Sequence, residues 1–190
     1  ANLGSVTALG TALTIAAGTQ GFAPATSSSA INLNTANLTV TGSGAVDLGN
    51  SVTASAVLGA SASGAITIDL KGLDFVGNVT TGTGNDVLSI ESAVRNTSGS
   101  YTLVTGAGTD SLTLSIAQSF SWNAGADYDT LNLAGDLNLN SNVISLTNVD
   151  EIRLDSASAG TKTVTINSAT FNTNNVFNLR GNSAGADVLI

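Results

Sequence analysis

Four glycine-rich turns, each carrying an aspartate, are the residues of this chain whose types and spacing could bind a metal ion. They read TGTGNDVL (81–88), TGAGTDSL (105–112), AGADYDTL (124–131) and NSAGADVL (182–189), and a leucine follows the last aspartate of each turn by two positions. Calcium takes about six to eight oxygen ligands. Glycine permits the positive φ angles that turn carbonyl oxygens inward, and aspartate adds negative charge. The pattern predicts Ca²⁺ ligands at Gly82, Gly84, Asp86, Gly106, Gly108, Asp110, Gly125, Asp127, Asp129 and Asp187.

Weaker relatives of these turns occur elsewhere in the chain. The turn at 41–48 has its acid, Asp47, one place late, and the turn at 147–152 has Asp150 without glycines. The turn at 62–66 has no acid. We therefore expect any column of acids to be broken.

Tight turns without a metal are the alternative reading of the same residues. Glycine supplies positive φ in such turns, and Asp or Asn can bond its own backbone. Asp127 lies two residues from Asp129, and nearby carboxylates repel each other unless a cation lies between them. That pair favours calcium locally, and both readings stay open at this point.

The turns recur with a period of about 20 residues. The second apolar residue after each turn serves as a marker, and successive markers are separated by 20, 20, 24, 19, 21 and 37 residues. The markers are Leu48, Ile68, Leu88, Leu112, Leu131, Ile152 and Leu189. We expect the last gap to hold two periods, with a rung through 163–171. A second series of short strands is expected between them, at 38–40, 56–58, 76–79, 101–104, 120–122, 143–146 and 176–179.

Two short strands in each period predict an all-β, parallel β-solenoid, because one such unit cannot bury its own apolar face and must stack on its neighbours. Two sheets about 10 Å apart have room for small aliphatic residues and little room for Trp or Phe. An antiparallel sandwich is the alternative fold, but it gives no reason for one kind of turn to follow one kind of strand. We assign 31–190 to the solenoid and 1–30 to an irregular N-terminal segment or a preceding rung. The chain reads as a piece of a larger repetitive protein.

Composition narrows the classes of function. The chain has 13 acidic and 5 basic residues, a net charge of -8, and neither Cys nor His. The scattered basic residues argue against nucleic acid as a partner, and cations are the better expectation. Without Cys or His there is no zinc site of the usual kind. The GNSAG segment at 181–185 matches the G-x-S-x-G motif of serine hydrolases, but the chain has no histidine to act as the base for a serine nucleophile. We therefore expect no enzyme. No apolar run is long enough to span a membrane, and the N-terminus lacks the basic region of a signal peptide.

The Gly/Asp turns resemble the calcium-binding nonapeptides of RTX proteins, G-G-x-G-x-D-x-U-x, and those of bacterial surface-layer (S-layer) proteins. The resemblance covers 31–190, although the first glycine is replaced by Thr81, Thr105 and Ala124. Turns on the opposite edge, such as 91–100, lack the motif, so at most one edge would bind calcium.

The resemblance implies a secreted, non-catalytic building block of a cell-surface lattice, exported without an N-terminal signal peptide and ordered by Ca²⁺. Its expected partners are copies of itself and cell-surface polysaccharide. The alternative that the resemblance leaves open is an RTX-type adhesin or biofilm-matrix repeat, or a filament-forming repeat.

Overall fold

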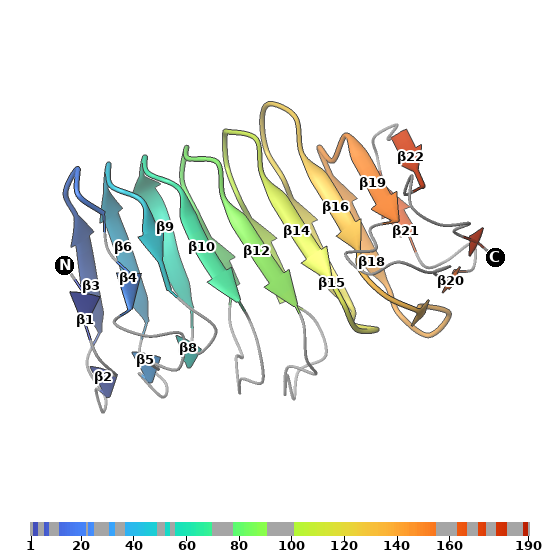
Figure 1. Ribbon diagram of the computed structural model, residues 1–190, viewed down its shortest axis with the longest axis horizontal. Coiled ribbons are helices and arrows are strands. Elements are labelled where there is room, and N and C mark those ends of the chain that lie inside the picture. Colours follow the sequence, from blue (N-terminus) through green and yellow to red (C-terminus); the bar gives the residue numbers. More distant parts are fainter. Residues whose placement is uncertain are drawn as a thin grey trace.

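The chain folds as a parallel β-solenoid of about five turns, with rungs of about 22 residues. The computed structural model describes residues 2–3, 6–7, 12–21, 23–24, 31–32, 37–48, 52–53, 56–69, 78–90, 101–154, 163–166, 171–173, 178–181 and 188–189. All regular elements within these ranges are β-strands, and they stand side by side along the long axis of the molecule (Figure 1). The expected fold class is confirmed.

Two long parallel sheets form the main sides of the solenoid. The first has eight strands, in the spatial order β3 (Leu13–Ala17), β6 (Leu38–Gly42), β9 (Val57–Ala62), β11 (Asn78–Thr80), β13 (Tyr101–Val104), β15 (Phe120–Asn123), β18 (Ile144–Thr147) and β21 (Phe171–Thr173). The second has seven strands, in the order β7 (Val46–Asp47), β10 (Ile66–Asp69), β12 (Val87–Ile90), β14 (Ser111–Leu114), β16 (Thr130–Leu133), β19 (Glu151–Leu154) and β22 (Asn178–Arg180).

Short strands add a third side to some of the rungs. They are β2 (Val6–Thr7), β5 (Ile31–Asn32) and β8 (Val52–Thr53) in one sheet, β17 (Leu137–Asn138), β20 (Thr163–Thr165) and β23 (Val188–Leu189) in another, and the pair β1 (Asn2–Leu3) and β4 (Ala23–Pro24). Sequence reasoning expected two strands in each rung and missed this side, because strands of two or three residues are too short to show a period-two pattern.

Alternation of apolar and polar residues decides which side chains enter the core. Ser111–Leu114 alternates between partly exposed and buried positions, as does Phe120–Asn123. One set of inward residues of the seven-stranded sheet stacks in register from rung to rung, and each of its members is at most 1% exposed. They are Ile68, Leu88, Leu112, Leu131 and Ile152. The predicted marker positions are therefore confirmed over these five rungs.

The last marker was wrong. Leu179, not Leu189, continues the stack after Ile152, while Leu189 pairs with Val164 on the third side. The segment predicted at 176–179 for the eight-stranded sheet thus belongs to the seven-stranded one, and β21 takes its place. The expected additional rung is present in β20 and β21. The error arose because turn residues were used as the guide where the turn signature had weakened.

The core also holds larger side chains than expected. Tyr101, Phe120 and Trp122 all point into the solenoid and are at most 1% exposed. Tyr101 and Phe120 lie in register on neighbouring strands, and the Trp122 indole N–H donates to the Thr105 hydroxyl at 3.2 Å. The expectation of little room for aromatic side chains was therefore wrong for these three positions.

Glycine is required where successive turns stack closely. Gly125 has φ +103°, and a Cβ there would collide with the backbone carbonyl of Gly106. We expect Gly125→Ala to lower the free energy of unfolding by about 2 kcal/mol or more, since both the backbone conformation and the space disfavour it. Gly18 has open space around its Cβ position, so Gly18→Ala is the matched control. Urea unfolding of both variants checks this, and equal losses would contradict it.

Within the described part of the chain, no helix has the length and apolar character needed to cross a membrane.

Candidate metal-binding turns

Three of the four Gly/Asp turns lie on one edge of the solenoid, where the chain passes from the eight-stranded to the seven-stranded sheet. The turn at 81–86 joins β11 to β12, that at 105–110 joins β13 to β14, and that at 124–129 joins β15 to β16. The turns stack in direct contact, because the Ala107 N–H donates to the Gly82 carbonyl at 3.1 Å and the Ala126 N–H to the Gly106 carbonyl at 2.8 Å. Parallel stacking therefore brings three of the four predicted turns together.

The aspartates of these turns form a column of inter-rung hydrogen bonds. One oxygen of Asp110 accepts the Asp86 N–H at 2.8 Å, and one oxygen of Asp129 accepts the Asp110 N–H at 2.8 Å. Asp86 accepts the Ile66 N–H at 2.7 Å, and Asp150 accepts the Asp129 N–H at 2.9 Å. Each carboxylate thus satisfies the backbone of the rung before it. We call Asp86, Asp110, Asp129 and Asp150 the aspartate column.

The second oxygen of three of these carboxylates is buried and has no hydrogen-bond partner. The atoms are Oδ2 of Asp86, Asp110 and Asp129, and their residues are 0%, 1% and 0% exposed. Buried polar groups are normally paired, because an unpaired one loses its hydration without compensation. Three such atoms at equivalent positions of successive rungs are therefore a feature that calls for a ligand or a proton.

The aspartate column ends where aliphatic residues take over the same position. Register places Ile66 before Asp86 and Val46 before Ile66, and both are buried. Asp47 lies one position further along its strand and is exposed. The prediction of a broken column, with no acid at 62–66 and a displaced acid at Asp47, is thus confirmed.

Threonine hydroxyls line the column on the side of the eight-stranded sheet. The Thr81 hydroxyl donates to the Thr105 carbonyl at 3.0 Å, and the Thr105 hydroxyl donates to the Ala124 carbonyl at 2.9 Å. The same two hydroxyls also lie close enough to Asp86 and Asp110 to lower their pKa values. A hydroxyl has one proton, so while it serves a carbonyl the adjacent carboxylate oxygen stays without a donor. These threonines stand where the RTX pattern has its first glycine.

Burial makes the column resist ionisation. It raises the pKa of Asp86 to about 6, and the Thr81 hydroxyl and Ile66 N–H offset only part of that rise. Burial likewise raises the pKa of Asp110 and takes that of Asp129 to about 7, where repulsion from Asp110, Asp150 and Asp127 adds to it. A positive charge next to the Oδ2 atoms would remove the cause of these shifts.

Polar side chains on the outside of the turns reach the middle turn from both neighbours. Asn85 Oδ1 accepts the Thr109 N–H at 3.0 Å, and the Asp127 carboxylate accepts the Gly108 N–H at 3.2 Å. Asp127 is exposed and has φ +79°, a conformation that is uncommon outside glycine. The predicted pair Asp127 and Asp129 is therefore split, with one acid outside the turn and the other inside.

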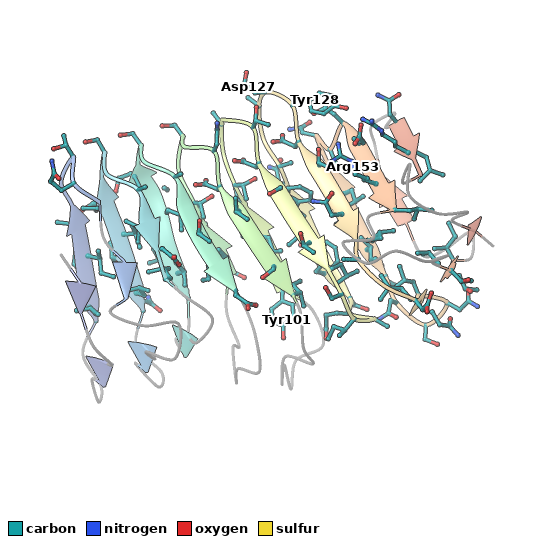
Figure 2. The ribbon with its side chains drawn as sticks, in the orientation of Figure 1. Tyr101, Asp127, Tyr128 and Arg153 are labelled. Carbon is teal, nitrogen blue, oxygen red and sulfur yellow. The ribbon has the colours of Figure 1, made fainter. Side chains whose placement is uncertain are left out.

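A second polar cluster follows the column toward the C-terminal end (Figure 2). The Tyr128 hydroxyl donates to Glu151 at 2.9 Å, and Arg153 binds the other oxygen of Glu151 at 2.6 Å. Glu151 is 5% exposed. Burial acts to raise its pKa, but the bonds from Tyr128 and Arg153 outweigh burial, so the pKa lies below its usual value. Sequence reasoning missed this cluster, because Tyr128 and Glu151 are 23 residues apart and match no motif.

The oxygen ligands available between neighbouring turns limit how an ion could be held. Within the described ranges, no three acidic side chains come together as a metal-binding group. An ion between neighbouring turns would therefore be held by one or two column carboxylates, with backbone carbonyl oxygens and water as the remaining ligands. Oxygen donors of this kind fit Ca²⁺, which accepts carbonyl oxygens and irregular geometry. Asp187, the ligand predicted for the fourth turn, lies outside the described residues.

The fold and this edge define the protein as a β-solenoid with an internal aspartate column. Comparisons with protein-family models, with curated proteins and with solved structures gave no match.

Proposed function

We propose that this chain is a structural, calcium-binding solenoid domain of a secreted bacterial surface-layer protein. The observation that supports calcium best is the set of unpartnered Oδ2 atoms of Asp86, Asp110 and Asp129. Each belongs to a carboxylate whose other oxygen is already used between rungs. Because these carboxylates are already desolvated and held in place, binding a cation costs them no further hydration.

The spaces between neighbouring full-length turns are the proposed sites. The turns at 81–86, 105–110 and 124–129 enclose two such spaces, whereas the following turn at 148–150 is shorter and carries no glycine. We therefore propose two ions for this region, each held by carboxylate and carbonyl oxygens of two successive rungs. Sites of this type exist only when the rungs are stacked, so binding and folding are coupled.

A role in the surface layer is supported by the repeat and the charge. A solenoid with a net charge of -8 that needs a divalent cation for full stability suits an environment with millimolar calcium, where sites with a Kd of about 10⁻⁴ to 10⁻³ M are occupied. Electron microscopy of the native assembly tests this role. A two-dimensional array supports it, and a thread or isolated particles would overturn it in favour of a filament or an adhesin.

Calcium removal is the direct test of the metal. We expect the Tm to rise by roughly 10 °C between chelator and an excess of CaCl₂, since two weak sites filled well above their Kd each add a few kcal/mol to the stability of the folded state. Isothermal titration should give two sites per chain. Equal Tm values in chelator and calcium would contradict the proposal.

The matched control for the metal is an acid away from the column. Asp136 is exposed, and its carboxylate accepts the Thr163 N–H on the third side. Asp136→Asn should leave the calcium response unchanged, whereas Asp129→Asn should reduce it. A similar loss in both variants would indicate a general charge effect and not a site.

A further inference from the structure

The outward face of the eight-stranded sheet carries no charge. The chain has 13 acidic and 5 basic residues, and none of them lies in the eight strands of this sheet. The other described sides all carry exposed acids, with Asp47 on β7, Asp127 at the turn edge and Asp136 beside the third side. Among the described sides, this is therefore the one on which two acidic copies meet without like charges in contact. We call the outward residues of β3 to β18 the eight-stranded face.

The centre of the eight-stranded face is β11. The strands β9, β6 and β3 follow on one side of it, and β13, β15 and β18 on the other. One outward column crosses the face in register and consists of Thr39, Leu58, Thr80, Val104 and Asn123. Leu58 is 39% exposed and Val104 is partly exposed. These two apolar side chains lie one strand to either side of Thr80, so the apolar part of the column is symmetric about β11.

A second copy turned by 180° about an axis parallel to β11, and lying over the face, would place matching side chains opposite each other. The rotation carries β9 of each copy over β13 of the other, so Leu58 meets Val104 on both sides of the axis. Thr80 and the exposed Asn78 lie under the axis and meet their own counterparts. A hydroxyl and a primary amide each contain a donor and an acceptor, so each can pair with an identical side chain.

We propose that the eight-stranded face is a self-complementary contact between two copies of this chain, with a two-fold axis that passes over Asn78 and Thr80 of β11. A two-fold contact uses the same patch on both partners, and this face matches apolar to apolar and amide or hydroxyl to its own kind under that operation. The inference rests on the proposed function for its setting, because it names the side through which copies of the chain assemble.

The side chains of this face favour a second copy over a polysaccharide. The aromatic residues of β13 and β15 are Tyr101, Phe120 and Trp122, and all three point into the core. These strands therefore offer a sugar ring no aromatic surface to stack on. Small hydroxyl and amide side chains allow two sheets to approach closely, and the absence of charge means that no ion has to be desolvated when they do.

The contact should be weak in solution and effective in an array. Seven strands about 4.8 Å apart and about four residues wide cover on the order of 400 Å² per copy, about half of what a stable interface buries on each partner. Such a contact becomes significant where copies are already held close together, because the effective concentration is then high.

Cysteine cross-linking tests whether copies meet through this face. The chain has no cysteine, so Asn78→Cys introduces a single thiol at the axis, which would meet its own copy. Opposed sheets lie about 10 Å apart, beyond the reach of a direct disulfide, so the probe is a short bis-maleimide at high protein concentration. We expect a cross-linked dimer from Asn78→Cys and roughly fivefold less from Thr67→Cys, an exposed outward position on β10 of the other sheet.

A mixture of two variants tests the position of the axis. Thr39 and Asn123 each lie two strands from β11, on opposite sides of it. Either thiol would therefore be about 20 Å from its own counterpart and about 10 Å from the other thiol. Thr39→Cys mixed with Asn123→Cys should cross-link, whereas each variant alone should give little dimer. Equal yields from the mixture and from the single variants would overturn the two-fold arrangement.

A charge placed at the axis tests the neutrality of the contact. Asn78→Asp in both partners would set two carboxylates against each other and should lower the yield from the Thr39→Cys and Asn123→Cys mixture about fivefold. Thr113→Asp adds the same charge to the other sheet, between neighbours in register that are uncharged, and should leave the yield unchanged. An equal fall in both variants would show that net charge, and not this face, controls association.

Salt gives an independent readout on the protein without the added charge. Raising the salt concentration should increase the cross-linking yield of Asn78→Cys, because salt screens the repulsion between two chains of net charge -8 and the face has no ion pair to weaken. A yield that falls with salt would show that ion pairs elsewhere hold the copies together, which would overturn the proposed contact. Melting curves of every variant establish that the fold is intact.

A yield from Asn78→Cys no higher than that from Thr67→Cys would also overturn the contact. Calcium-dependent melting of the same samples separates this failure from that of the proposed function. An intact calcium response without specific cross-linking overturns only the eight-stranded face as a contact. Specific cross-linking without a calcium response overturns the metal and leaves the contact.

Discussion

Replacing Asp110 with alanine should destabilise the calcium-free protein by about 1 to 3 kcal/mol, whereas Asp110→Asn should leave it as stable as the parent or more so. Alanine removes the acceptor of the Asp86 N–H, and a buried donor without a partner costs about that much. Asparagine keeps an oxygen for the Asp86 N–H and replaces the unpartnered Oδ2 by an amide group. The amide is neutral, so burying it costs less free energy than burying a carboxylate.

With calcium bound, the parent should become more stable than the Asp110→Asn variant, which reverses the order of their stabilities in chelator. Asp110 stands between the two proposed sites, so loss of its charge weakens both, and the apparent affinity should fall by about tenfold or more because ligand charge sets the strength of calcium sites. Urea unfolding with chelator and with calcium measures both effects on the same samples. If the asparagine variant gains as much stability from calcium as the parent, the aspartate column is not the metal site.

The calcium-free protein should become less stable as pH rises from about 5 to 8. Burial raises the pKa of Asp86 to about 6 and that of Asp129 to about 7, from an ordinary value of 3.8. A carboxyl with a raised pKa binds its proton more tightly in the folded state, so its stabilising contribution is complete below pH 3.8 and is lost as pH rises through 6 and 7. The loss should be on the order of 3 kcal/mol, or roughly 10 °C in Tm.

Melting in chelator at pH 5.5 and pH 8.0 measures this effect. The pKa of Glu151 lies below its usual value, so its contribution is lost only at lower pH and does not enter this window. Excess calcium should abolish most of the difference, because the ion takes the place of the protons. A calcium-free Tm that is higher at pH 8.0 than at pH 5.5 would show that the column is not desolvated as the structure has it.

The architecture could be predicted from the sequence because it depends on local patterns. The alternation in SLTL at 111–114 and the glycines before it determine a strand, a turn and the spacing to the next rung. The same spacing placed Asp86, Asp110 and Asp129 on one edge. The aspartate column itself could be recognised only from the register of the strands, because the parallel pairing is what shows that Ile66 and Asp86 occupy the same position in successive rungs.

The contacts between rungs could not be predicted in this way. Tyr128 reaches Glu151 across 23 residues of sequence, and nothing in either local pattern indicates the other. Tyr101 and Phe120 are buried together because two strands happen to align them, and Leu179 replaces Leu189 because the chain forms a third side before it returns. These features depend on the path of the whole rung, which turn residues alone do not determine.

The aspartate column has a direction, because every carboxylate accepts an N–H from the rung that precedes it. A chain that emerges from the ribosome N-terminus first would expose the Asp86 amide until Asp110 has been synthesised, and the Asp110 amide until Asp129 has been. Each turn is thus completed by the one made after it, so consolidation of the edge lags one rung behind translation and proceeds toward the C-terminus.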